Sequence, residues 1–199
     1  MTPTDIANLA LGKLGEPRIA DLLDGTRGAD AMSARYPHTR RAMLSSTPWR
    51  FAVRVVMLPA LGGPAPASGY ARAFARPGDD LKPLMVGDEA AHPVPMVSAR
   101  QGRAFRVVGT QIHTDLAAPL RYEYVSDLTP EAEFPAEFVE ALACRLAADA
   151  ARELTQSSAA MQEAAAGLAS ALRDARRSNM LWSPPVSRRT GPWLASRHG

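Results

Sequence analysis

Few side chains in this sequence have the type and spacing that chemistry requires. The single cysteine, Cys144, lies in a run of alanines and leucines, where a free thiol behaves as a small core side chain. A reactive thiolate needs a neighbour that lowers its pKa, and the adjacent sequence supplies none. Cys144 is therefore predicted to be a core residue, and a single cysteine cannot form an intrachain disulfide.

Histidines and acidic pairs are the next candidates. The histidines are scattered, without the short intervals of zinc ligands, at His38, His92, His113 and His198. The doublets Asp79-Asp80 and Asp88-Glu89 could hold a cation, but solvated turn residues are the commoner use and the prediction here. The sequence has no phosphate-binding glycine loop, nucleophile elbow or zinc-protease motif. We therefore predict no catalytic residues, no metal, no cofactor and no enzymatic activity.

The composition is that of an ordinary globular protein, with 46% hydrophobic and 22% charged residues. No apolar run is long enough to span a membrane, and no secretory signal is recognisable, so we expect folding in a cytoplasm. The net charge of +3 is dispersed. Solvated helix faces or subunit salt bridges are the expected roles of the basic patches at Arg40-Arg41, Arg173 with Arg176-Arg177, and Arg188-Arg189.

The elements that must position these residues are helices at both chain ends around a β-rich centre. We expect an α+β fold that is mainly α: a helical bundle with αα-hairpins from both chain ends, a small central antiparallel β insertion and an extended C-terminal tail. The expected bounds are one domain over about 1–180, helices over about 3–14, 28–46, 130–155 and 158–179, a β insertion over about 51–126, and a tail over 181–199.

The N-terminal helices have clear start and stop signals. Thr2 is predicted to cap the first helix, with Asp5 completing a capping box. The second helix contains Pro37, which predicts a kink or a break, and Pro48 ends it. An extended segment is predicted to begin at 49–51.

Short apolar runs separated by glycine and proline predict a small antiparallel sheet in the centre. Residues 61–69 are predicted to be a loop, and Gly109 a hairpin turn or bulge. The expected strands lie within 51–58, 84–86, 105–108 and 122–125.

Two helices are predicted to follow and to pack as an αα-hairpin. Thr129 is the expected cap of the first, and Ser157 or Ser158 of the second. The second helix is rich in alanine, which buries little surface, so we expect close partners on one or more of its sides. The first carries an apolar stripe at four-residue spacing, formed by Phe138, Leu142, Leu146, Ala150 and Leu154.

The segment after the last helix mixes arginine, proline and tryptophan without periodicity. Tryptophan and arginine are favoured contact residues at protein interfaces, so we predict that this tail binds a neighbouring subunit or another protein; a fold onto its own subunit is the alternative. Its predicted interface residues are Trp182, Pro184, Pro185, Arg188, Arg189, Trp193 and Leu194.

Several motifs stand in a definite order along the chain. They are Leu14-Gly15 at the end of the first helix, Ala34-Arg35-Tyr36-Pro37, Pro48-Trp49-Arg50-Phe51-Ala52, residues 105–114 and residues 138–147. Their order resembles the tail tubular protein A-like head-to-tail connector adaptors of short-tailed bacteriophages. The resemblance covers roughly residues 5–180. The region 62–91 departs from the family pattern.

The resemblance implies a structural protein. Its subunits would form a ring, typically a dodecamer, below the portal protein, extending the DNA channel and offering a platform for the next tail component. It implies location at the head–tail junction of a virion assembled in the host bacterial cytoplasm. It also implies contact with the portal, with itself, with the downstream tail or nozzle protein and with passing genomic DNA, without sequence-specific binding and without a membrane. The motif residues implied to be structural are Leu14, Gly15, Tyr36, Pro37, Pro48, Trp49 and Phe51.

Two other functions remain open at this point. A DNA-binding or packaging-associated phage protein would use its arginines on phosphates and would bind DNA with strong salt dependence. A hydrolase of the cell envelope would need a paired carboxylate site, which the sequence does not reveal.

Overall fold

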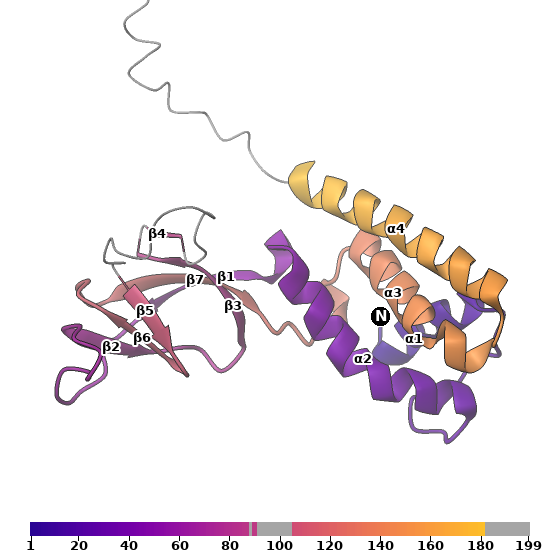
Figure 1. Ribbon diagram of the computed structural model, residues 1–199, viewed down its shortest axis with the longest axis horizontal. Coiled ribbons are helices and arrows are strands. Elements are labelled where there is room, and N and C mark those ends of the chain that lie inside the picture. The colour runs from indigo at the N-terminus through magenta and orange to yellow at the C-terminus, as the bar shows by residue number, and fades with distance from the viewer. Residues whose placement is uncertain (88, 91–104, 182–199) are drawn as a thin grey trace, which may run out of the picture.

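A computed structural model of the chain describes residues 1–87, 89–90 and 105–181. They form two lobes, one of four α-helices and one of β-strands (Figure 1). The β lobe is inserted between the second and third helices along the chain. This confirms the α+β, mainly α, fold class with a central antiparallel β insertion; the tail at 182–199 lies outside the described residues.

Helix α1 (Pro3–Lys13) begins with the capping box that the sequence predicts. The Thr2 hydroxyl accepts a hydrogen bond from the Asp5 backbone at 3.1 Å, and the Asp5 carboxylate accepts one from the Thr2 backbone at 2.8 Å. Helix α2 (Arg27–Ser46) runs without a break through Pro37. Core residues on both sides of Pro37, among them Tyr36 and Met43, hold the two halves in place, so packing overrides the missing hydrogen bond.

Helix α3 (Ala136–Leu154) begins later than the sequence predicts, and Thr129 is not its cap. A 3-10 turn, Glu131–Glu133, comes first, and Phe134 is extended. The reason is Pro135, because a residue before proline avoids the helical conformation. Helix α4 (Ser158–Leu181) is capped by Ser157, whose hydroxyl accepts the Ala160 N–H at 3.3 Å.

Two antiparallel sheets form the β lobe. Among the described residues, one has the order β1-β7-β3-β4 and the other β2-β6-β5. The strands are β1 (Val53–Leu58), β2 (Arg72–Ala75), β3 (Asp80–Val86), β4 (Glu89–Ala90), β5 (Phe105–Val108), β6 (Gln111–Thr114) and β7 (Leu120–Ser126). Gly109, at φ 57°, makes the β5–β6 hairpin turn. The predicted extended segment at 49–51 is instead the 3-10 turn Arg50–Ala52, followed by β1.

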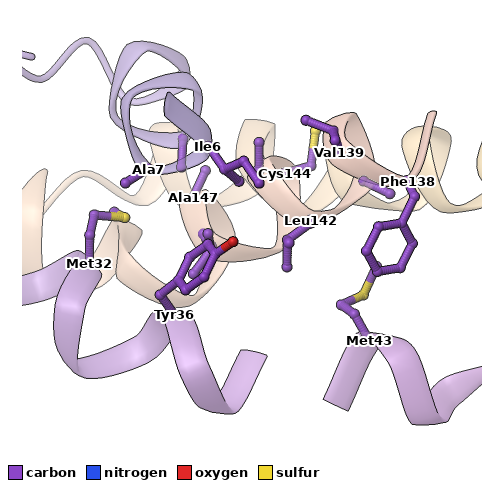
Figure 2. Packing of buried hydrophobic residues seen from close by; sticks show 14 of the residues in the cluster. Ile6, Ala7, Met32, Tyr36, Met43, Phe138, Val139, Leu142, Cys144 and Ala147 are labelled. Atoms are coloured by element: carbon purple, nitrogen blue, oxygen red, sulfur yellow. The ribbon is translucent and has the colours of Figure 1, made fainter. Parts of the chain in front are cut away.

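Two hydrophobic cores support the lobes. In the larger core, side chains of α1 and α2, such as Ile6 and Met32, converge on α3 (Figure 2). The predicted stripe of α3 is buried throughout. This core also takes in Val125 of β7, so it extends from the bundle into the first sheet. The smaller core lies within the β lobe around Phe74, Ile112 and Tyr122.

Helix α4 lies along α3 at the edge of the helical lobe (Figure 1). Of its residues, only Ala171 and Ala175 are buried. Leu168 and Leu172 pack against the core, whereas the opposite face is open. None of the described helices is both long enough and apolar enough to cross a membrane.

Candidate functional site

The Pro48–Phe51 motif forms a turn between the two lobes. Trp49 is 1% exposed, and its indole N–H donates to the Met43 carbonyl at 2.7 Å. The Trp49 ring meets the Phe138 ring edge-on, with 5.1 Å between centroids. The Phe51 ring also meets the Phe138 ring edge-on, at 4.9 Å. Phe134 completes the group at 5.0 Å from Phe138. Edge-to-face pairs of this kind fix ring orientation as well as burying area, so the turn is rigidly placed against α3.

The last turns of α4 bind the same turn through Asn179. The Asn179 carboxamide accepts the Arg50 backbone N–H at 3.0 Å and donates to the Pro48 carbonyl at 3.3 Å. One side chain therefore satisfies two backbone groups of the connection between α2 and β1. This fixes the end of α4 beside the aromatic turn.

An apolar pocket of about 340 Å³ opens between these elements. The rings of Trp49, Phe51 and Phe138 line it together with Pro135 and Ala175. Ser178 and Asn179 of α4 contribute to one side, and Arg50 and Glu137 supply the charged groups. The volume is at the low end for ligand sites, so the pocket fits one large side chain rather than a folded partner.

The remaining motif residues lie outside this site; they are Leu14, Gly15, Tyr36 and Pro37. Leu14 ends α1 and Gly15 follows at φ 72°, a left-handed conformation that favours glycine. The Tyr36 hydroxyl donates to Glu131 at 3.1 Å, and burial raises the pKa of this tyrosine. Pro37 and Pro48 are exposed. The structure thus joins Pro48, Trp49 and Phe51 in one site, but not Tyr36 or Leu14.

The prediction for Arg40-Arg41 needs correction. Arg40 is buried and forms an ion pair with Asp127 at 2.7 Å, and it also donates to the Leu128 carbonyl. Arg41 is exposed and reaches the other oxygen of Asp127 at 2.8 Å. Arg40 therefore does not lie on a solvated face. Both arginines fasten α2 to the segment that follows β7.

In the acidic doublet, Asp79 is an exposed turn residue, as the sequence predicts, but Asp80 is not. The Asp80 side chain is 1% exposed, and its carboxylate accepts hydrogen bonds from Arg76 at 2.8 Å and from the Tyr122 hydroxyl. Asp79 accepts the Tyr124 hydroxyl at 3.0 Å. These bonds tie the start of β3 to β7, so the carboxylates are structural. Asp88 lies outside the described residues, as do His92 and His198.

Cys144 is buried, and burial raises the pKa of its thiol. Lys13, far away in sequence, does approach and opposes that shift, which the adjacent sequence could not reveal. His38 is exposed on α2, whereas His113 is buried, with Nδ1 2.7 Å from the Ser68 hydroxyl and Nε2 3.0 Å from the Gln111 carboxamide. These contacts anchor the loop 61–69 onto β6.

Of the basic patches, Arg173, Arg176 and Arg177 are exposed on α4. In the described part of the chain, no three histidine, cysteine or acidic side chains are grouped as metal ligands would be. The predicted interface residues Trp182, Pro184, Pro185, Arg188, Arg189, Trp193 and Leu194 lie outside the described residues.

No model of a known protein family matches the chain, and no curated protein matches it. The site residue that sequence reasoning missed is Asn179. Its partner is 129 positions away, and a single asparagine near a helix end gives no signal of such a contact.

Proposed function

We propose that this protein is a structural adaptor of a bacteriophage head-to-tail connector, which acts by assembling into a ring below the portal. The observation that carries the proposal is the open face of α4. This helix spans Ser158–Leu181, yet it buries only Ala171 and Ala175 in the single chain. The outer side carries small residues, Ala159, Ala166 and Ser170, that let a neighbouring subunit approach closely.

The contact between ring subunits must join two different surfaces, because head-to-tail repetition is what closes a ring. The open face of α4 supplies one long surface of this kind at the edge of the helical lobe (Figure 1). The motifs that carry the resemblance to the adaptor family support the same role. In this proposal the portal binds one side of the ring, the next tail component binds the other, and genomic DNA passes through.

Deleting the gene from the phage or prophage that encodes it tests this function. The expected result, seen by electron microscopy of the lysate, is heads without tails. Tailed particles in normal number would contradict the proposal. Restoring the gene from a plasmid should restore tails, which controls for effects on neighbouring genes.

A DNA-binding or packaging-associated role is the alternative, and one observation favours it. Arg173, Arg176 and Arg177 are exposed within two turns of α4, where they could contact phosphates. DNA affinity of the isolated protein that falls steeply with salt, without any association with a portal, would support this role over the adaptor.

A further inference from the structure

The apolar pocket beside the Pro48–Phe51 turn is open in the described part of the chain, and the chain itself supplies a side chain suited to it. Its walls are aromatic, and the two residues of α4 that line it near the helix end, Ser178 and Asn179, are held there by the bonds from Asn179 to Pro48 and Arg50. The described part of α4 ends at Leu181, two residues after Asn179 of the pocket lining.

Helical spacing indicates which face of α4 residue 182 would share if the helix continued by one residue. The residues of α4 that face α3 or the pocket include Leu168, Ala171, Ala175 and Ser178. Residue 182 follows Ala175 by seven positions and Ser178 by four, and these intervals repeat on one face of a helix. Met180, in contrast, is 72% exposed, as expected for the opposite face.

We propose that Trp182 of the same chain fills this pocket and anchors the start of the C-terminal tail. An indole is the largest apolar side chain and packs well on aromatic edges, and Arg50 at the rim can lie over its face. Pro184 and Pro185 then prevent the helix from continuing and favour an extended chain.

This anchor would divide the tail into two parts. Trp182 would fix the direction in which the tail leaves the subunit, and Trp193 would remain free. Eleven positions separate the two, so Trp193 could extend roughly 35 Å from the pocket. The predicted interface would then be formed by the later residues, around Arg188, Arg189 and Trp193, with Trp182 as an internal contact.

Acrylamide quenching of tryptophan fluorescence in the full chain tests this. The variant Trp193→Phe keeps Trp49 and Trp182. The double variant Trp182→Phe/Trp193→Phe keeps only the buried Trp49, and its quenching is the baseline. The variant Trp182→Phe reports on Trp193 in the same way. After subtraction of the baseline, we expect the quenching constant of Trp182 to be severalfold smaller than that of Trp193 at every protein concentration. Ser178→Arg, which places a long side chain in the pocket, should expose Trp182, while Ser170→Arg on the open face of α4 should not.

Three results would overturn the proposal. Trp182 could be quenched as strongly as free tryptophan amide. It could stay protected in Ser178→Arg, which would place it elsewhere. Its protection could appear only as concentration and mass rise together, which would mean that a second copy fills the pocket. The quenching experiment uses the isolated protein, so its result does not depend on a portal. A negative quenching result would leave the adaptor proposal intact, and a protein that does not bind a portal would leave this inference intact.

Discussion

Phe138 is in contact with three other aromatic rings, those of Trp49, Phe51 and Phe134, and is 1% exposed. Replacing it with alanine removes the common partner of the aromatic turn and leaves a cavity. We expect Phe138→Ala to lower the free energy of unfolding by about 3–5 kcal/mol, measured by urea denaturation. Arg152→Ala, an exposed change on the same helix, should stay within roughly 0.5 kcal/mol. Similar losses for both variants would contradict the packing described.

Arg40 and Arg41 share Asp127 but differ in burial, with 7% and 60% of their side chains exposed. Removing the buried partner leaves Asp127 and the Leu128 carbonyl poorly satisfied. Arg40→Met should therefore cost about 3–5 kcal/mol of stability. Arg41→Met should cost under about 1 kcal/mol. Equal unfolding midpoints for the two variants would show that the buried Arg40–Asp127 ion pair contributes no more stability than the exposed Arg41–Asp127 pair.

Tyr124 predicts a loss of stability in alkali. Burial, and then its bond to Asp79, raise the pKa of Tyr124 from 10.0 to about 12. Above the unfolded pKa, the unfolded chain loses the phenol proton while the folded chain keeps it, so ionisation favours unfolding. The free energy of unfolding should thus be unaffected by this group below pH 10 and fall between pH 10 and 12. Tyr124→Phe should show a shallower fall in denaturation series; an unchanged slope would count against the assignment.

At the scale of elements, the end of α4 depends on Asn179. Asn179→Ala removes both bonds to the Pro48–Arg50 backbone and should cost about 1 kcal/mol. The loss should be local, because α4 beyond Ala175 has few other buried contacts. Amide hydrogen exchange should therefore speed up in the last turns of α4 and at Arg50, but not in α3. Unchanged exchange at both places would contradict a role of the Asn179 hydrogen bonds in holding the end of α4.

Elements with strong periodicity or caps could be predicted from the sequence, and others could not. The Thr2–Asp5 capping box and the α3 stripe are local patterns, so α1 and α3 were recognisable. Strand β2 was not, because Phe74 is its single buried residue and its pairing with β6 is set only when the strands meet. The site shows the same division. The Pro48–Phe51 motif is visible in sequence, whereas its contacts with Phe138 and Asn179 join distant segments.

At the scale of the whole molecule, the two lobes leave α4 along one edge with its outer face open (Figure 1). Ala166 lies near the middle of that face. Ala166→Arg should leave the unfolding midpoint unchanged, because the side chain is exposed, but should prevent close approach of a neighbouring subunit. Ala34→Arg, also exposed but on α2, is the control and should assemble normally. Normal assembly of Ala166→Arg would remove the α4 face from the ring interface.

The mass of the protein alone and after mixing with its cognate portal ring tests the central claim most directly. Native mass spectrometry or light scattering measures both states. The adaptor account predicts that the portal gains a fixed number of copies of this chain, forming one closed ring, and that Ala166→Arg reduces that number. A portal whose mass does not change at any salt concentration would contradict the account.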